Sequence, residues 1–231
     1  MQDNMTAAVV TRRWQLAQGY HAVEVETKHR SEIPSFDDGA IVDLTRDHDC
    51  RVVRTHPLWH LPSQKNAFVV GVRQEADARE RCDGSEFSWN HGDEFYLGTP
   101  RNTKIVMNCS ARYILFSAGL GATTIAAVAK RLAAAGETFE VHNFSRTLER
   151  TIFRRELDEL QEYGQVHHRI GLKEEEIEIA TSLAVSPTHA NSQIFFSGPP
   201  LFMENIERQA RQWVYSSNIH KIVLGETQSK W

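Results

Sequence analysis

Cysteine is scarce in this chain of 231 residues, and its placement excludes two kinds of site. The three cysteines, Cys50, Cys82 and Cys109, are scattered, so they form neither a disulfide framework nor the ligand set of a zinc cage. The four-cysteine spacing of a plant-type iron–sulfur site is absent as well, which predicts no iron–sulfur cluster in this chain. We expect a protein of a reducing compartment, the cytoplasm.

The chain also lacks a long apolar run and an excess of positive charge. No stretch is apolar over the length needed to span a bilayer, and the start shows no charged–apolar–small signal pattern. The formal net charge is -4, so no basic field favours nucleic acid as a partner. We therefore expect neither a membrane nor a nucleic acid among the partners.

Standard metal and hydrolase patterns are missing too. Histidines gather in two parts of the chain, but their spacing matches no zinc pattern in either part. These residues are His48, His56 and His60, with Cys50 among them, and then His142, His167 and His168. No Ser–His–Asp order and no pair of carboxylates stands out for hydrolysis. The sequence therefore predicts no metal site.

The first half of the chain has the sequence pattern of an all-β domain. Short runs of strand-forming residues recur through residues 6–108, separated by turn signals such as His91-Gly92-Asp93. Many short strands at this spacing are typical of a sandwich or a barrel, and closing the sheet removes exposed edges. A turn is expected at His56-Pro57. The expected strands are Ala7–Arg13, Tyr20–Glu26, Ile41–Leu44, Arg51–Thr55, Ala67–Arg73 and Glu94–Leu97.

From residue 109 onward, strands and helices alternate, which predicts a parallel sheet with helices on both faces. Segment 165–190 is expected to form a loop and a short helix, because Lys173–Ile179 is too charged for a central strand. The expected strands are Arg112–Phe116, Thr138–Phe144, Gln193–Phe196 and Ile219–Leu224. The expected helices are Thr123–Ala135, Leu148–Leu160 and Phe202–Ser216.

Two glycine-bearing turns are the most informative feature of this half. They are Ser117–Thr124 and Ser197–Met203, and each follows an apolar run and leads into a helix-like stretch. Glycine lets a backbone approach a phosphate closely, and a helix N-terminus supplies N–H donors and the positive end of a dipole. Ligands of a parallel sheet bind beyond the carboxyl ends of its strands, where both turns fall. The pair predicts a site for a nucleotide with a diphosphate and a reactive ring.

Several motifs occur in the order found in one known family. In the first half, Ile33–Leu44 fits a barrel segment Pro-x-Phe-x-x-Gly-Ala-x-x-Asp-Leu, and His91–Asp93 with Thr99–Asn102 fits Gly-Asp…Pro-Arg-Asn. The second half adds Gly119-x-Gly121-x-Thr123, Phe144-Ser145-Arg146, and Ser197-Gly198-Pro199 followed by Phe202-Met203. On these motifs the chain resembles the ferredoxin–NADP reductase superfamily, and within it the group of phthalate dioxygenase reductase and vanillate demethylase reductase.

The resemblance implies a two-domain fold, with a flavin-binding-type antiparallel β-barrel over residues 1–108 and an NAD(P)-binding-type α/β domain over residues 109–231. It implies a flavin-dependent NAD(P)H oxidoreductase that serves as the electron-transfer component of a multi-component oxygenase or demethylase. The cofactors would be FMN or FAD, with FMN favoured, and NAD(P)H. Electrons would pass to a separate iron–sulfur or haem oxygenase or ferredoxin component, which allows a hetero-oligomeric complex.

The resemblance also assigns residues to the site. Ser197 and Thr123 are the expected catalytic residues, because Ser197 replaces a cysteine that faces the nicotinamide and Thr123 brings a hydroxyl to the phosphate. Arg146 either accepts a 2′-phosphate of the adenosine or is a solvated helix-start residue, and Trp231 either stacks on the flavin or belongs to a disordered tail. The other implied cofactor-binding residues are Arg54, His56, Val70, Gly71, Val72, Gly84, Ser85, Gly119, Gly121, Ala122, Ser145, Gly198, Pro199, Phe202 and Met203.

Departures from the family pattern leave a second interpretation open. In the flavin signature Arg-x-Tyr-Ser, Arg54 is kept, His56 replaces tyrosine, and Pro57 replaces serine with loss of a hydroxyl and an N–H. Glu86 would oppose a flavin phosphate, and Leu224 stands where an aromatic residue would cover the flavin ring. The alternative is therefore a flavin-less accessory or structural subunit of an oxygenase complex. A nucleotide-sensing regulatory subunit is a third interpretation.

Overall fold

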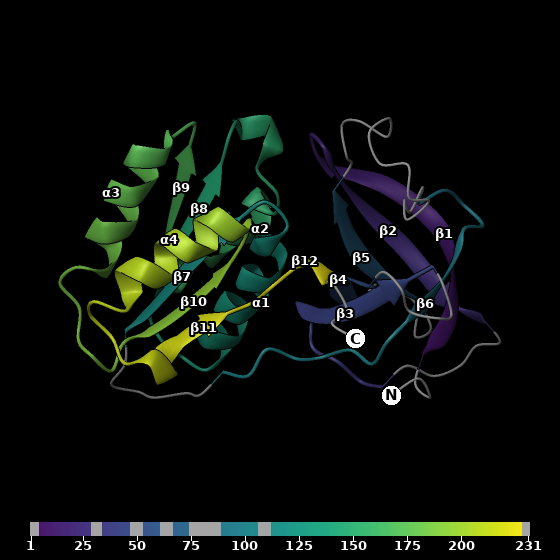
Figure 1. Ribbon diagram of the computed structural model, residues 1–231, viewed down its shortest axis with the longest axis horizontal. Helices are drawn as coiled ribbons and strands as arrows, with labels where there is room; N and C mark the ends of the chain where they lie inside the picture. The colour runs from purple at the N-terminus through teal and green to yellow at the C-terminus, as the bar shows by residue number, and fades with distance from the viewer. Residues whose placement is uncertain are drawn as a thin grey trace. The chain divides into compact units, whose positions relative to one another are not determined.

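The chain folds into two compact units (Figure 1). The first comprises Met1–Thr103 together with Leu224–Trp231, and the second comprises Lys104–Val223. The boundary expected at residues 108–109 falls outside the described residues, and the C-terminal residues expected in the second domain group with the first unit instead. The computed structural model describes residues 5–28, 34–46, 53–60, 67–73, 89–105 and 112–227.

The first unit is a closed antiparallel β-barrel, as expected. Its strands follow the order β4-β3-β6-β1-β2-β5, and β4 also pairs with β5, so the sheet closes on itself. Closure pairs the two strands that would otherwise be edges. The strands are β1 (Thr6–Ala17), β2 (Tyr20–Thr27), β3 (Ala40–Thr45), β4 (Val53–His60), β5 (Ala67–Arg73) and β6 (Glu94–Leu97).

Strand β4 runs through the segment that the sequence predicts to be a turn. The prediction of a turn at His56-Pro57 is wrong, because β4 is continuous from Val53 to His60. On one edge, residues 58–60 pair with β5 and residues 53–55 pair with a seventh strand, β12 (Gly225–Thr227). Pro57 lies between these two pairings, where its missing N–H interrupts neither ladder.

The core of the barrel is aliphatic with three aromatic rings. Inward-facing residues alternate along the strands, as the period of two requires. Trp89, which precedes β6, joins this core and is 7% exposed. The buried cluster consists of Ala8, Val10, Val23, Val25, Val42, Leu44, Leu58, Phe68, Val70, Val72, Trp89, Phe95 and Leu97.

The second unit is a five-stranded parallel sheet with helices on both faces, which confirms the predicted α/β class. The strand order is β11-β10-β7-β8-β9. Helix α1 (Gly121–Ala134) lies on one face, and α3 (Glu174–Val185) and α4 (Pro200–Ala210) lie on the other (Figure 1). The strands are β7 (Tyr113–Ala118), β8 (Phe139–Ser145), β9 (Gln165–Ile170), β10 (Gln193–Ser197) and β11 (Ile219–Lys221).

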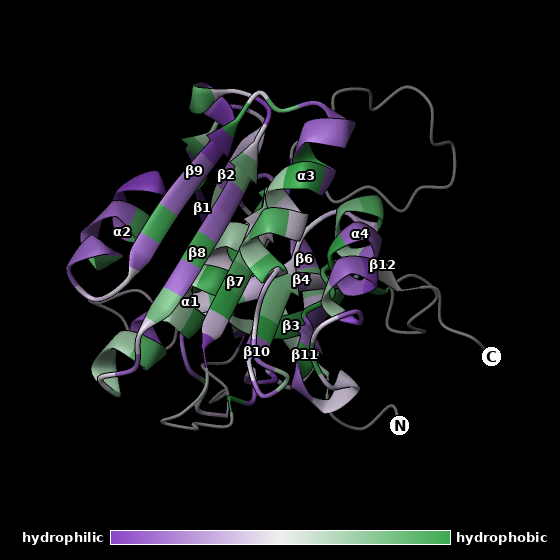
Figure 2. Ribbon diagram, turned by 90° about the vertical axis from the view of Figure 1, so that its left-hand side faces the viewer, coloured by the Kyte–Doolittle hydropathy of each residue, from purple (hydrophilic) through white to green (hydrophobic). Residues whose placement is uncertain are grey.

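Hydropathy falls from the centre of this sheet to its edge. The side chains of β10 are all buried, and those of β7 are buried up to Ser117, because helices cover both faces of these strands. Strand β9 is mostly polar and half-buried, and Figure 2 shows it largely in purple, whereas β7 and β10 are largely green. The sequence prediction missed β9 because a polar edge strand lacks the apolar run of a central one.

Two predicted helices are shorter than their apolar spacing indicates. The expected helix Leu148–Leu160 is divided by Phe153, whose φ of 53° lies in the left-handed region. The segment consists of a 3₁₀ turn at Leu148–Arg150, helix α2 (Arg154–Asp158) and a second 3₁₀ turn at Glu159–Glu162. Helix α4 ends at Ala210, well before the expected Ser216.

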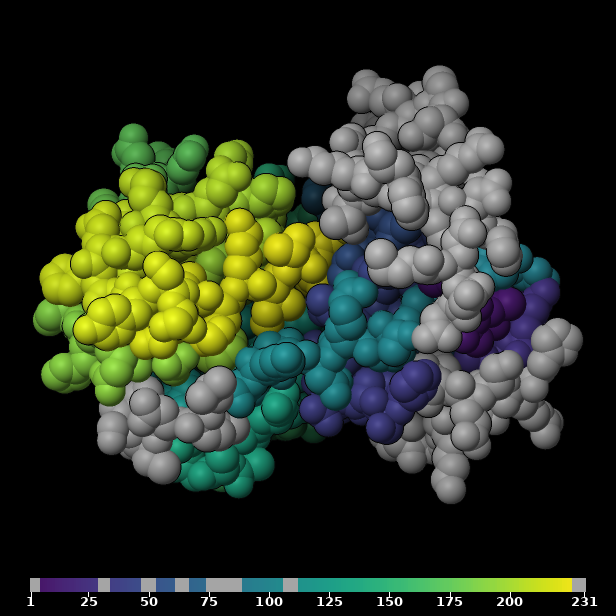
Figure 3. All heavy atoms as spheres, turned by 60° about the horizontal axis from the view of Figure 1, so that its bottom comes forward, coloured from purple at the N-terminus to yellow at the C-terminus, as the bar shows by residue number. Residues whose placement is uncertain are grey.

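The exposed side of α4 and β11 forms one face of the second unit. In Figure 3 the yellow atoms of this segment cover that face. Leu201 at the start of α4 is 76% exposed, whereas Met203 and Ile206 are buried against the sheet. Among the described residues, no helix combines the length and the apolar character that crossing a membrane requires.

Candidate functional site

The two glycine turns of the second unit lie against each other. A Cβ atom on Gly121 would be 2.1 Å from the carbonyl oxygen of Ser197 and 2.9 Å from the nitrogen of Gly198. A Cβ atom on Gly198 would be 2.7 Å from Cδ1 of Phe202 and 3.1 Å from Cβ of Ala118. Because β7 and β10 are adjacent parallel strands, both turns leave the sheet at the same edge. Glycine at these positions therefore permits the contact between the two backbones.

The start of α1 uses several of its polar groups within its own turn. Gly119 has a φ of 55°, and its carbonyl accepts a hydrogen bond from the N–H of Ala122 at 3.0 Å. The carbonyl of Leu120 accepts from both the N–H of Thr123 at 3.1 Å and the Thr123 hydroxyl at 2.7 Å. A phosphate at this turn would share these donors with the backbone. Phosphate binding by Gly121, Ala122 and Thr123 stays a prediction.

Ser197 is fully buried at the carboxyl end of β10. Its hydroxyl donates to the carbonyl of Ile222 at 2.9 Å, which ties the end of β10 to the segment that follows β11. On the neighbouring strand, the Ser117 hydroxyl donates to Oδ1 of Asn143 at 2.8 Å. Small hydroxyl residues thus line the carboxyl ends of the central strands. The expected role of Ser197 beside a nicotinamide stays a prediction.

The second turn offers fewer donors to an anion than the first. Pro199 caps α4 and Pro200 is its first residue, and proline carries no N–H. Phe202 in the first turn of α4 packs edge-on against Phe144 of β8 with ring centroids 5.2 Å apart, and Met203 is buried beneath it. This turn therefore presents apolar and aromatic side chains and few N–H donors.

The end of β8 carries hydroxyls and an exposed cation. The Ser145 hydroxyl lies 2.7 Å from the hydroxyl of Thr151 and donates to the carbonyl of Thr147 at 3.1 Å. Arg146 is exposed directly after this strand. Because Arg146 is exposed, its guanidinium can donate hydrogen bonds to an anionic group without the cost of burying its charge.

In the barrel, His56 is enclosed rather than exposed. Its Nδ1 lies 2.9 Å from the carbonyl of Gly71, and its ring packs edge-on against Trp89 with centroids 5.4 Å apart. Burial lowers the pKa of His56 to about 4, against the raising effect of the Gly71 hydrogen bond, and the charge of Arg54 lowers it further. Nδ1 therefore donates to Gly71 in the neutral ring, and Nε2 remains an acceptor.

Two of the described barrel residues, Arg54 and His56, offer a donor and an acceptor that suit a flavin, whereas the β5 residues are engaged within the barrel. The Nε2 atom of His56 is buried and has no hydrogen-bond partner among the described residues, so a ring N–H could bond there. Arg54 is half-buried two residues away on the same strand and can pair with a phosphate. Of the β5 residues, Val70 pairs with strands on both sides, and the carbonyl of Gly71 is engaged by His56. Val72 pairs with His21 of β2.

Some expected site residues lie outside the described residues. Gly84 and Ser85, which were expected at a flavin phosphate, are among them, as is the opposing Glu86. Trp231 is among them too, so its expected stacking on a flavin stays a prediction. Leu224 precedes β12 and groups with the barrel.

The structure also assembles a cluster that the sequence prediction missed. Glu140, His142 and His167 present ligand-type atoms that all lie within 4.8 Å of one another. Alternation along β8 could have placed Glu140 and His142 on one face. Because β9 was not predicted, its register with β8, which brings His167 beside His142, could not be expected.

Hydrogen bonds set the charge of this cluster. The bond from His142, and after it the bond from Arg112, holds the pKa of Glu140 at about 2, although burial alone would raise it. Burial lowers the pKa of His167, and the neighbouring His142 lowers it further. At neutral pH, Glu140 is a carboxylate and His167 is a neutral imidazole.

Comparison with known proteins relates the chain to oxygenase reductases. No family model matches it. It is 27% identical over 206 residues to a vanillate O-demethylase oxidoreductase of Acinetobacter baylyi, a match that covers 88% of this chain and 63% of the relative. It is 22% identical over 229 residues to phthalate dioxygenase reductase of Burkholderia cepacia, which covers 98% of this chain and 70% of the relative. The chain thus spans less than two thirds of the length of the vanillate relative.

Solved structures agree on the fold. A structure of phthalate dioxygenase reductase, a protein described as transferring electrons from pyridine nucleotides to [2Fe–2S], matches with a TM-score of 0.72 and 21% identity. That match covers 96% of this chain and 68% of the other. A ferredoxin reductase of carbazole 1,9a-dioxygenase matches with a TM-score of 0.69 and 16% identity, over 94% and 68% of the two chains. The chain is thus a homologue of the reductase components of oxygenase and demethylase systems, with the ferredoxin reductase-like fold.

Proposed function

We propose that the protein is an NAD(P)H-dependent flavin oxidoreductase that acts as the electron-transfer component of an oxygenase or demethylase. The observation that carries this proposal is the contact of the two glycine turns, in which Gly121 leaves no space for a side chain beside the Ser197 carbonyl. Through this contact the backbones of the two turns lie side by side at the carboxyl ends of β7 and β10. A backbone surface at this position is suited to the diphosphate and ring of a pyridine nucleotide.

Residues of the second unit have separate roles in holding the nucleotide. Gly119, Gly121, Ala122 and Thr123 receive the diphosphate at the start of α1, where the helix dipole favours negative charge. Ser145 and Arg146 border the adenosine, and Arg146 favours a 2′-phosphate and hence NADPH. Ser197, Gly198, Pro199, Phe202 and Met203 form the wall for the nicotinamide.

The barrel residues orient the flavin. Arg54 pairs with its phosphate, and His56 accepts a hydrogen bond at Nε2 while its Nδ1–H remains bonded to Gly71. The backbone of Val70, Gly71 and Val72 borders the ring, and Gly84 and Ser85 contribute to the phosphate site. When bound, the flavin supplies two-electron acceptance from a nicotinamide and one-electron release. FMN is favoured over FAD through the family resemblance.

The electron acceptor would be a separate iron–sulfur or haem protein. The relatives are reductases named for vanillate and phthalate systems, so an oxygenase or ferredoxin partner is consistent with their names. The expected compartment is the cytoplasm, as the scarcity of cysteine predicts. A hetero-oligomeric complex would shorten the path of each electron.

An absorption experiment tests the proposal. The purified protein is incubated with FMN or FAD, free flavin is removed, and the visible spectrum is recorded before and after addition of NADH or NADPH under argon. Retained flavin bands that bleach with NAD(P)H are the expected result. A colourless protein that still binds NADPH in calorimetry would contradict the proposal and leave a nucleotide-binding protein.

One observation favours a flavin-less accessory subunit as a second candidate. Strand β12 pairs with β4 along Val53, Arg54 and Thr55, which covers part of the edge of the strand that carries the flavin signature. Pro57 acts in the same direction, because proline has no backbone N–H to offer a ligand. Loss of oxygenase assembly on removal of this protein, with no flavin retained, would support this candidate.

A further inference from the structure

A row of rings crosses the α3 face of the sheet in the second unit. The registers place Phe116 of β7 beside His142 of β8, and His142 beside His167 of β9. The rings of Phe116 and His142 stack with centroids 5.2 Å apart, and the two imidazoles stack with centroids 4.9 Å apart. The row is apolar at the centre of the sheet and carries nitrogen only toward its edge.

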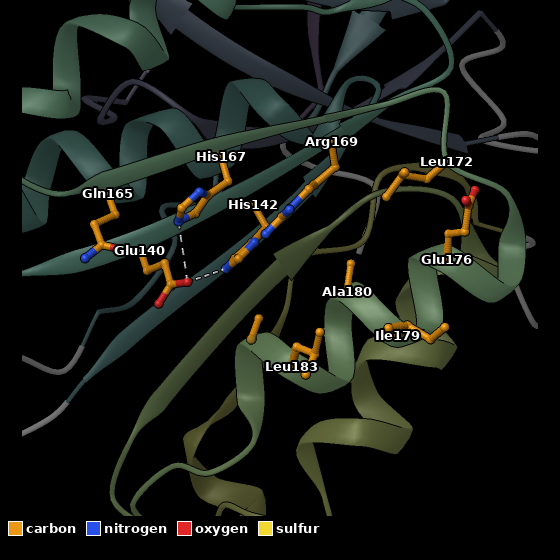
Figure 4. A pocket seen from close by; sticks show the side chains of 11 residues that line it. Glu140, His142, Gln165, His167, Arg169, Leu172, Glu176, Ile179, Ala180 and Leu183 are labelled. Atoms are coloured by element: carbon orange, nitrogen blue, oxygen red, sulfur yellow. Dashed lines mark hydrogen bonds and ion pairs between the residues drawn. The ribbon is translucent and has the colours of Figure 1, made fainter.

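The two imidazoles converge on one carboxylate oxygen. Oε1 of Glu140 lies 2.8 Å from Nε2 of His142 and 3.6 Å from Nε2 of His167, and both contacts are drawn as dashed lines in Figure 4. The other oxygen, Oε2, accepts a hydrogen bond from Arg112. Arg112 therefore orients the carboxylate and leaves Oε1 directed to the histidines.

These three side chains lie at one end of a cavity of about 460 Å³. The cavity is bounded by β8 and β9 on one side and by Ala180, Leu183 and their neighbours on α3 on the other (Figure 4). His142 is 1% exposed, whereas the His167 side chain is 37% exposed. The cluster is thus shielded on the sheet side and accessible from the cavity.

We propose that Glu140, His142 and His167 form a binding site for a divalent transition-metal cation, for which Zn²⁺ has the matching ligand preference. Two imidazoles and one carboxylate are a common three-residue ligand set for Zn²⁺ with an open fourth position. Metal–ligand bonds of about 2.0–2.2 Å in a tetrahedral arrangement place the ligand atoms about 3.4 Å apart. The separations of 2.8 and 3.6 Å from Oε1 of Glu140 bracket that value, and all three ligand atoms lie within 4.8 Å of one another.

The charges around the cluster fit this ligand set. Glu140 offers a carboxylate oxygen and the two histidines offer ring nitrogens, and all three atoms face one another. The cation would take the place of the hydrogen bond between His142 and Glu140. Arg112 acts on the far oxygen of Glu140 as an outer partner, the kind of contact that orients metal ligands.

The fourth ligand is expected from the cavity. Arg169 lines the same cavity, and its Nε is buried with no hydrogen-bond partner among the described residues. A buried N–H of this kind needs an acceptor. A metal-bound water or small anion supplies one, which offsets the repulsion between the guanidinium and the cation.

Metal titration of the full chain tests the site. The protein is dialysed against a chelator, exchanged into buffer, and titrated with ZnCl₂ by calorimetry, with thermal unfolding measured in parallel. The test variants are His167→Ala and His167→Gln, because this residue lies at the accessible edge. His168→Ala is the matched control, since His168 is the next residue on β9 and its Nε2 bonds instead to Asp158 at 2.8 Å.

The expected results separate a metal site from a hydrogen-bonded network. The natural protein should bind one Zn²⁺ per chain and unfold at a higher temperature with Zn²⁺ present. Both His167 variants should bind at least about tenfold more weakly, since even changes around a metal site's ligands cost about 10- to 100-fold. His168→Ala should stay within about twofold. Absence of Zn²⁺ binding by the natural protein, or equal affinity in the His167 variants and the control, would overturn the proposal.

Discussion

At the residue scale, Gly121 and His56 each lie directly against a backbone carbonyl of a neighbouring strand. The carbonyl oxygen of Ser197 occupies the space where a side chain on Gly121 would begin. The carbonyl of Gly71 holds the ring of His56, whose other nitrogen has no partner among the described residues. Both positions are sensitive to substitutions that would be harmless on a surface.

Gly121→Ala should reduce the free energy of unfolding by about 3 kcal/mol, because overpacking of a rigid backbone contact costs about 1–3 kcal/mol or more. Urea unfolding measures the change. Gly136→Ala is the control, since a Cβ there meets no atom within 4 Å and only the φ of 73° opposes it, at a cost of about 1 kcal/mol. Equal losses in the two variants would show that the turns do not touch as described.

Stability should fall in acid through His56. The folded protein keeps this ring neutral with a pKa of about 4, while the unfolded chain protonates it near 6.5. The unfolded state therefore binds more protons between these values, and the free energy of unfolding decreases by up to about 3 kcal/mol as the pH falls from 6.5 to 4.

Urea unfolding at pH 7 and pH 4.5 measures this dependence in the natural protein and in His56→Gln. Glutamine retains a donor for the Gly71 carbonyl but does not titrate. The variant should lose less stability than the natural protein over this interval. An identical pH dependence of the two proteins would show that His56 is not buried in the neutral form.

At the scale of elements, the C-terminal ends of the parallel strands are linked by single side-chain bonds. The Ser197 hydroxyl joins the end of β10 to the chain after β11. Ser197→Ala leaves the buried carbonyl of Ile222 without this donor, so the second unit should lose about 1–2 kcal/mol. Ser197→Cys retains a weak donor and should lose less. Thermal unfolding followed by near-ultraviolet circular dichroism measures both, and an unchanged Ser197→Ala protein would contradict the described bond.

Elements with a strong period could be predicted from the sequence, and polar edge elements could not. Strands β5 and β6 were predicted with their observed bounds, because apolar residues and turn signals delimit them. Strand β9 was missed because an edge strand has a partner on one side and needs little apolar surface. The helix expected from Leu148 failed at Phe153, because a left-handed residue is not visible in apolar spacing.

The candidate site was predictable in part for the same reason. Glycine and proline mark the two turns of the proposed nucleotide site in the sequence itself. The cluster of Glu140, His142 and His167 depends on the register of β8 with β9, which only the fold supplies. The enclosure of His56 depends on Trp89, a residue far along the chain with a φ of 53°.

At the scale of the whole molecule, the first unit is built from two separate parts of the chain. Removal of residues 224–231 takes away β12 and its pairing with Val53, Arg54 and Thr55. The free energy of unfolding of the barrel should then fall by about 1–2 kcal/mol. The unfolding transition of the second unit, residues 104–223, should stay unchanged. Hydrogen exchange of the β4 amides measures the local change. Unaltered exchange at residues 53–55 would exclude the pairing.

The same pairing sets an order of events during synthesis. The ribosome delivers β1 to β6 first, then all of the second unit, and only afterwards the strand that pairs with Arg54. While residues 104–223 are being translated, β12 does not yet exist, so residues 53–55 of β4 have an open edge. During this interval a strand from another molecule could take the place of β12, so chaperone contact at β4 is expected before β12 has been synthesised and paired, and not afterwards.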